Sequence, residues 1–228
     1  MTSFSIKTFG CRVNQAEAFL WSDLFQKRGL HYEKDLSQSD VVIVNSCTLT
    51  SRSDSDVRNF IRKVSRTNPG ARLIVTGCYV ERVPEEIRRM PQVWRIFSNT
   101  EKDDLAQEVL SLVSRKEKNL IIPFRSRVLV KIQDGCNFCC TFCIIPRVRG
   151  ISVSFEKREI LSQIKEFIGQ GFKEIVLTGI HICSYGADLK PESSLLRLLQ
   201  EISSLDGIGR VRLSSLDPRF LDIPLIEC

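Results

Sequence analysis

The sequence contains no apolar run approaching the roughly 18 residues that a membrane-spanning helix requires. Its most apolar segments, residues 40–45 (DVVIVN) and 119–124 (NLIIPF), have only the length of buried strands. The first residues also lack the charged region followed by an apolar region that marks a signal peptide. We therefore expect a cytoplasmic protein without a membrane partner.

The chain also has little histidine, no internal repeat and no low-complexity tract. Its two histidines, His31 and His181, lie in segments that we interpret as surface or loop, so neither is a candidate base. The net charge of +6 permits a polyanionic partner but excludes few classes of protein. The 228 residues, 43% of them hydrophobic, fit one large globular domain or two small ones.

Cysteine, by contrast, is abundant. The chain has nine cysteines, an odd number without the regular spacing of a secreted disulfide scaffold. Thiols stay reduced in the cytoplasm, so disulfides do not explain this number. Some of these cysteines are therefore candidates for metal binding or redox chemistry.

The first half of the chain alternates strand-like and helix-like segments. Strands are predicted at residues 4–9, 40–45 and 72–76, and segments with helical spacing follow them. This alternation is typical of a parallel, Rossmann-like α/β sheet. Cys11, Cys47 and Cys78 each follow one of these strands. Since the carboxyl ends of parallel strands share one edge, where ligands bind, we expect the three cysteines to converge there.

The second half repeats the alternation after a charged segment, residues 114–119 (SRKEKN), which is the best linker candidate. Strands are predicted at residues 128–132, 174–178 and 210–213, with helices between them. Three consecutive β/α units are typical of the opening part of a barrel. The sequence thus predicts two α/β domains, residues 1–118 and residues 119–228.

Four cysteines lie within residues 134–150 (DGCNFCCTFCIIPRVRG). Two Cys-x2-Cys pairs could form a structural zinc site or a redox dithiol, but zinc sites usually have a longer spacer between the pairs. The grouping Cys136-x3-Cys140-x2-Cys143 would instead provide three thiolates for an iron–sulfur cubane with one iron open to another ligand. Cys139 then has no assigned role, and neither does Cys183 outside the segment.

The second grouping, with an aromatic Phe142 before its last cysteine, resembles the signature of radical S-adenosylmethionine (SAM) enzymes. In that family the open iron chelates SAM, and the position of Phe142 usually lies against the SAM adenine. Residues 8–18 (TFGCRVNQAEA), 44–48 (VNSCT) and 77–80 (GCYV) resemble the N-terminal domain of methylthiotransferases. That resemblance implies that Cys11, Cys47 and Cys78 hold an auxiliary cluster, and that the second domain begins a radical SAM partial (β/α) barrel.

The residues of three further motifs resemble those of one branch of that family. GCRVNQAE, VLTGIHICSYG and VRLSSLDP are similar to the MtaB-type branch, which adds a methylthio group to the adenine 2-position of threonylcarbamoyladenosine beside the tRNA anticodon. One alternative is the branch that modifies isopentenyladenosine. Another is a non-catalytic iron–sulfur or zinc fragment that binds RNA.

The resemblance also implies cofactors, partners and further site residues. We expect two [4Fe-4S] clusters and SAM, a monomer, the tRNA anticodon stem-loop as substrate, and an electron donor such as flavodoxin or ferredoxin. Strand-end residues could contact SAM, although turn chemistry would also explain them: Thr178, Gly179, Ser214 and Ser215. Basic side chains could meet tRNA phosphates, although a solvated helix face is an equal explanation for the last four: Arg147, Arg149, Arg58, Arg62, Lys63 and Arg66.

Relatives in this family are longer than the present chain. They have further barrel strands and a C-terminal β domain that grips tRNA, whereas this sequence ends soon after its third predicted barrel strand. We therefore expect a truncated chain that can assemble one or both clusters but does not turn over tRNA by itself.

Overall fold

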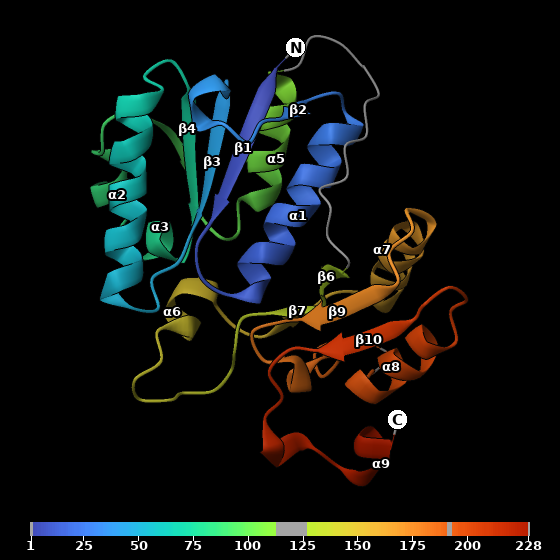
Figure 1. The fold of residues 1–228 in the computed structure, drawn as a ribbon. Helices are drawn as coiled ribbons and strands as arrows, with labels where there is room; N and C mark the ends of the chain where they lie inside the picture. The colour runs from blue at the N-terminus through green and yellow to red at the C-terminus, as the bar shows by residue number, and fades with distance from the viewer. Residues whose placement is uncertain (1, 113–126, 191–192, 228) are drawn as a thin grey trace. The chain divides into compact units, whose positions relative to one another are not determined.

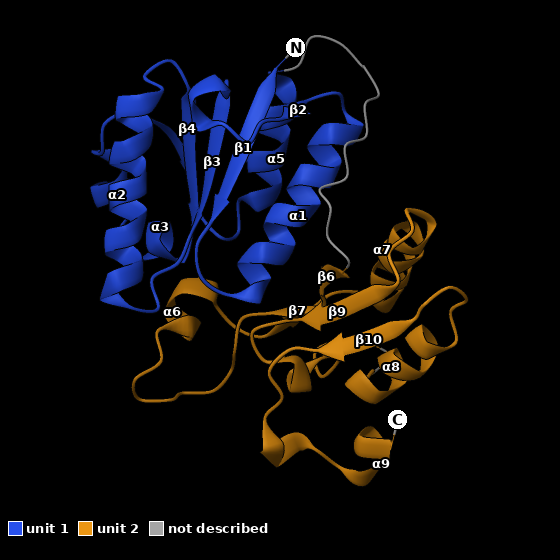
Figure 2. Cartoon of the chain, in the orientation of Figure 1, with its two compact units in different colours: residues 1–123 blue, residues 124–228 orange. Residues whose placement is uncertain are grey.

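The computed structural model describes residues 2–112, 127–190 and 193–227. It divides the chain into two compact units, Met1–Pro123 and Phe124–Cys228 (Figure 2). The predicted domain boundary between residues 118 and 119 lies outside the described residues. Within the described ranges, no helix is both long enough and apolar enough to span a bilayer.

The first unit is built on a five-stranded sheet in which every strand pair is parallel (Figure 1). The strand order is β2-β1-β3-β4-β5. The strands are β1 (Ser3–Thr8), β2 (His31–Tyr32), β3 (Val41–Ser46), β4 (Arg72–Gly77) and β5 (Val93–Phe97). The helices are α1 (Arg12–Lys27), α2 (Ser51–Thr67), α3 (Cys78–Arg82), α4 (Pro84–Arg88) and α5 (Lys102–Ser111), with a short 3-10 helix, η1 (Leu36–Gln38).

The central strand β3 shows why this sheet is covered on both faces. All six of its residues are buried, and successive side chains of a strand point to opposite faces. Val42 and Val44 belong to the core beneath α2, whereas Val41 and Ile43 belong to the core shared by α1 and α5 (Figure 1). A continuous β-branched run is therefore the expected sequence of this strand.

The second unit has a three-stranded parallel sheet of order β10-β9-β6. Its strands are β6 (Arg127–Lys131), β9 (Glu174–Thr178) and β10 (Arg210–Leu213). The helices are α6 (Ile145–Arg149), α7 (Lys157–Gly169), α8 (Leu195–Ser203) and α9 (Ile223–Glu227), with 3-10 helices η2 (Ile182–Ser184) and η3 (Pro218–Phe220). Helix α7 connects β6 to β9 and α8 connects β9 to β10, so the three strands form successive β/α units.

A small antiparallel pair lies between β6 and α7. It consists of β7 (Gln133–Asp134) and β8 (Val153–Ser154), and the cysteine-rich segment is the connection between these two strands. Sequence analysis missed this pair, because a strand of two residues carries no periodicity. The expected fold class, a parallel α/β sheet followed by the opening of a β/α barrel, is otherwise confirmed.

Candidate functional site

The first group of predicted ligands lies at the carboxyl edge of the first sheet. Cys11, Cys47 and Cys78 follow β1, β3 and β4, and these three strands are direct neighbours in the sheet. Cys11 is exposed, whereas Cys47 and Cys78 are buried. The sheet topology thus brings the three positions to one edge, as the strand ends predicted.

Asn14 ties two of these cysteine loops together. Its side-chain amide donates to the carbonyl oxygens of Phe9 and Ser46, both at 2.9 Å, and its Oδ1 lies 3.6 Å from the Cys11 sulfur. Asn14 is fully buried, so these bonds satisfy an amide that would otherwise be costly to desolvate. Its position just after Cys11 therefore has a structural reason that is independent of any ligand.

Gly10 explains how closely the Cys11 and Cys47 loops approach each other. Its φ of 92° belongs to the left-handed region, and a Cβ on this residue would lie 2.5 Å from the Cβ of Cys47. A side chain at this position would force the two loops apart.

One buried and one partly exposed ion pair involve residues of the first unit. Lys102 Nζ lies 2.7 Å from Glu17 Oε2, which also accepts from Asn45 Nδ2 at 3.0 Å. Arg58 Nη1 donates to the hydroxyl of Tyr79 at 2.5 Å and lies 3.5 Å from Glu86. That hydrogen bond is the main reason why the pKa of Arg58 is raised. Arg58 therefore has an intramolecular role, whereas Arg62, Lys63 and Arg66 are exposed on α2.

The second group of predicted ligands lies on the loop between β7 and β8. A buried ion pair closes the base of this loop: Arg149 Nη1 donates to both carboxylate oxygens of Asp134, at 2.9 and 2.8 Å. The Arg149 side chain is 0% exposed, and Lys131 Nζ adds a second contact to Asp134 at 2.6 Å. The prediction that Arg149 meets tRNA phosphates is therefore wrong, because its guanidinium is already paired inside the protein. Arg147 is exposed, as that prediction requires.

The four thiols of this loop differ in exposure. Cys136 and Cys143 are partly buried, whereas Cys139 and Cys140 are exposed. The Cys143 amide donates to the Cys140 carbonyl at 3.0 Å, and Phe142 between them is 93% exposed. In the described parts of the chain, no three His, Cys, Asp or Glu side chains gather closely enough to hold a metal ion. The two predicted cysteine triads therefore stay predictions.

Two buried hydroxyls lie where SAM is expected. Thr178 ends β9, and Ser214 follows Leu213, which pairs with Leu177 in the neighbouring strand. Thr178 Oγ1 and Ser214 Oγ are both buried without a hydrogen-bond partner among the described residues. An unpaired buried hydroxyl is costly, so these groups fit a site whose polar ligand satisfies them. Ser215 is exposed beside them.

Gly179 has a packing reason to lack a side chain. A Cβ on this residue would lie 2.9 Å from both the backbone oxygen and Oε1 of Gln133. Gln133 is fully buried, and its Oε1 accepts from the His181 amide at 2.8 Å. Gln133 therefore makes the close approach to Gly179, and a SAM contact at Gly179 stays a prediction.

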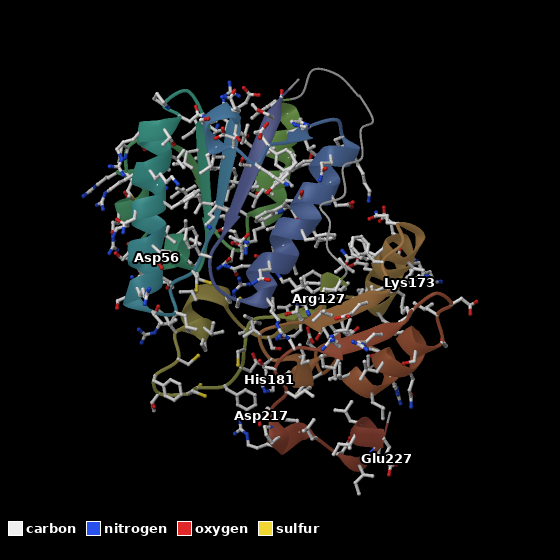
Figure 3. All side chains as sticks on the ribbon, viewed as in Figure 1. Asp56, Arg127, Lys173, His181, Asp217 and Glu227 are labelled. Atoms are coloured by element: carbon white, nitrogen blue, oxygen red, sulfur yellow. The ribbon has the colours of Figure 1, made fainter. Side chains whose placement is uncertain are left out.

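His181 is more than the loop residue that the sequence indicated. Its side chain is 14% exposed, and its Nδ1 lies 2.6 Å from Ser184 Oγ. Its Nε2 lies 3.5 Å from Asp217 Oδ2, and both residues are labelled in Figure 3. Hydrogen bonds from Arg219 hold the pKa of Asp217 well below its usual range. No local sequence pattern indicates this contact, because 36 residues separate its partners.

Comparisons with known proteins match two separate segments of the chain. Residues 3–98 match an uncharacterized protein family, UPF0004, and residues 130–223 match the radical SAM superfamily. The described fold also resembles the radical SAM methyltransferase TsrM from Kitasatospora setae, with a TM-score of 0.66 at 11% identity. That likeness covers 100% of this chain and 57% of TsrM.

Curated relatives extend the similarity to almost the whole sequence. The threonylcarbamoyladenosine tRNA methylthiotransferase MtaB of Aquifex aeolicus is 33% identical over 98% of this chain and 58% of its own length. The protein of the same name from Chlamydia pneumoniae is 36% identical over 95% of this chain and 51% of its own length. The chain thus spans about half the length of these relatives. Over almost its whole length, the present chain is thus similar to radical SAM methylthiotransferases, among them the MtaB-type proteins that it matches.

Proposed function

We propose that this chain carries the cluster-binding parts of a methylthiotransferase that modifies threonylcarbamoyladenosine beside the tRNA anticodon. One observation supports this most strongly. Each of the two family matches contains one predicted cysteine triad. The first triad follows strands of a parallel sheet, and the second lies on the loop between β7 and β8. A single chain with two such triads fits a reaction that needs both a radical source and a sulfur source.

The proposed cofactors are two [4Fe-4S] clusters and SAM. Cys136, Cys140 and Cys143 would hold the cluster that binds SAM, and the triad of the first sheet would hold the other. When bound, SAM and the cluster held by Cys136, Cys140 and Cys143 would supply a radical. Such a radical can remove hydrogen from an aromatic carbon that acid–base groups cannot activate.

The chain's own residues would bind and orient these groups. The hydroxyls of Thr178 and Ser214 are buried and free to hydrogen-bond a polar ligand at the ends of β9 and β10. The Asp134–Arg149 pair fixes both ends of the cysteine loop. Phe142 is exposed on that loop and so is available to stack on an adenine.

The proposed substrate is tRNA, with a reducing electron donor as a second partner. The names of the Aquifex and Chlamydia relatives support threonylcarbamoyladenosine over isopentenyladenosine. An excess of basic side chains, six over the acidic ones, is compatible with a polyanionic substrate. Arg147 is the exposed arginine of the cysteine loop and is the best candidate there for a phosphate contact.

Nucleoside mass spectrometry of tRNA tests this assignment. We expect cells that lack the gene to accumulate threonylcarbamoyladenosine without its methylthio group, while methylthio-isopentenyladenosine stays at its normal level. Loss of methylthio-isopentenyladenosine alone would assign the chain to the branch that modifies isopentenyladenosine. No change in either nucleoside would contradict the proposed function.

A further inference from the structure

The edge strand β5 of the first unit is irregular where it begins. Gln92, just before this strand, has a φ of 66° and is the one non-glycine residue with a positive φ in the described ranges. The pairing register also shifts: Leu73 pairs with Val93, but the next residue of β4 pairs with Arg95. Trp94 is therefore an extra residue without a partner on β4. Such a bulge redirects a side chain, and bulges are frequent beside binding sites.

The bulge brings Trp94 together with two arginines. Adjacent side chains of a regular strand point to opposite faces, yet the Arg95 guanidinium lies 5.5 Å from the centroid of the Trp94 ring. The guanidinium of Arg72, at the start of β4, lies 5.0 Å from the same centroid. We call these three side chains the Trp94 platform. Their cation–π contacts hold two positive charges at one exposed ring.

The Trp94 platform is exposed and only partly neutralised. The Trp94 side chain is 39% exposed, and both arginines are exposed. Glu108 Oε1 lies 3.4 Å from Arg95 Nε, whereas no carboxylate of the described residues lies within ion-pair distance of Arg72. The platform therefore offers a ring for stacking and guanidinium donors for an anion.

The Trp94 platform is remote from the first predicted cysteine triad. Arg72 begins β4 and Cys78 follows its end, so the platform lies at the amino edge of the sheet, about 20 Å from the cysteine edge at the usual rise of a strand. The carboxylate of Asp40, whose carbonyl accepts from the Arg72 amide, is bound by the amide and hydroxyl of Ser3 at 2.7 and 2.9 Å. A ligand at the platform would thus be held apart from this triad.

We propose that the Trp94 platform binds the tRNA substrate, with phosphate groups on Arg72 and Arg95 and an unstacked base on Trp94. RNA is recognised largely at single-stranded loops, whose bases stack on aromatic rings and on guanidinium planes. A guanidinium that is fixed on a ring can bind a phosphate through two N–H groups. The inference rests on the proposed function because it takes tRNA as the substrate, and it adds a contact remote from the first triad.

Binding of tRNA to the full chain tests the platform. The probe is tRNA that carries threonylcarbamoyladenosine, and its Kd is measured at several salt concentrations. Trp94→Ala removes the stacking ring and Arg72→Gln removes the unpaired charge, so misfolding of one variant leaves the other to decide. The matched control is Arg88→Gln, which removes an exposed arginine of the same unit that is ion-paired with Glu85 at 2.8 Å.

We expect Trp94→Ala to weaken tRNA binding by about five- to a hundredfold, the effect of losing one stacked base. Arg72→Gln should also weaken binding and reduce the slope of log Kd against log salt by about one, because one phosphate contact is lost. Arg88→Gln should bind tRNA like the parent chain. In the parent chain, tRNA should quench the fluorescence of Trp94, since this ring is exposed whereas Trp21 is buried. Heparin, a polyanion without bases, should bind Trp94→Ala and the parent chain equally.

No measurable binding of tRNA by the parent chain, or unchanged binding in both Trp94→Ala and Arg72→Gln, would overturn the proposal. An equal loss of heparin and tRNA binding in Trp94→Ala would also overturn it, because the platform would then be a general polyanion surface. The nucleoside assay tests the proposed function separately. If that assay shows no change while the two variants lose tRNA binding, the platform stands as an RNA site and the proposed function fails.

Discussion

At the scale of single residues, the adjacent thiols of Cys139 and Cys140 pose the sharpest question. Both are exposed, and only Cys140 fits the Cys-x3-Cys-x2-Cys spacing that begins at Cys136. We expect Cys139→Ala to keep the full iron content of a reconstituted chain. Cys140→Ala should lose one of two clusters, which is about four of eight irons. Iron and sulfide assays on both variants measure this, and the opposite pattern would assign the ligand to Cys139.

Tyr185 offers a prediction that is independent of any cofactor. Burial, and then the nearby carboxylates of Glu156, Asp188 and Glu201, raise the pKa of Tyr185 to about 12 from its usual 10. A raised pKa in the folded state means that this contribution to stability is complete below pH 10 and is lost as the pH rises toward 12.

Tyrosinate absorbance and denaturant unfolding across that pH range check this prediction. In Tyr185→Phe, the tyrosine that ionises at the highest pH should be absent. The free energy of unfolding of this variant should therefore fall less between pH 10 and pH 12. Normal titration of Tyr185 near pH 10 would show that its hydroxyl is not buried beside these carboxylates as the structure describes.

Sequence reasoning succeeded at residues whose position depends on the strand pattern and failed at residues whose role depends on distant partners. Cys11, Cys47 and Cys78 were placed correctly at one sheet edge, because strand ends are legible from apolar runs. Arg149 was wrongly assigned to the surface, because nothing local reveals that Asp134 faces it across the loop. His181 was undervalued for the same reason, since its partner Asp217 follows another strand.

At the scale of elements, the loop between β7 and β8 depends on the Asp134–Arg149 pair. Removing one partner of a buried ion pair leaves an uncompensated charge, so we expect Arg149→Ala to destabilise this region by roughly 3 kcal/mol. The effect belongs at the lower end of the usual range because Lys131 still contacts Asp134. Arg147→Ala, on the same helix but exposed, should have little effect.

The positions of the two tryptophans allow the effect of Arg149→Ala to be assigned to one unit. Trp21 and Trp94 both lie in the first unit, so tryptophan fluorescence reports on that unit alone. Arg149→Ala should leave the fluorescence transition unchanged and speed hydrogen exchange in peptides from β6 and β9. Equal exchange in the variant and the parent would contradict a stabilising role for the ion pair.

Elements were predictable in proportion to their length and burial. The six-residue strands β3 and β4 carry long β-branched runs and were found from sequence. The two-residue strands β2, β7 and β8 were not, because such short segments have no periodicity and form only through their pairing. The missed β7–β8 pair matters most, since it frames the cysteine loop.

At the scale of the whole molecule, the chain has two α/β units, each with one predicted cysteine triad. It spans about half the length of its Aquifex and Chlamydia relatives, so turnover by this chain alone is a separate question from cluster assembly. Two triads on one chain predict two clusters that can be removed independently. A Cys47→Ala change should therefore lower iron content without abolishing the response of the remaining cluster to SAM.

Anaerobic reconstitution followed by iron analysis and electron paramagnetic resonance tests the central claim most directly. We predict about eight irons per chain, with a reduced-cluster signal that changes on addition of SAM. Replacing Cys136, Cys140 and Cys143 by alanine should leave about four irons and remove the change caused by SAM. Tightly bound zinc, or a signal that SAM does not alter in the parent chain, would contradict the claim that this loop holds a SAM-binding cluster.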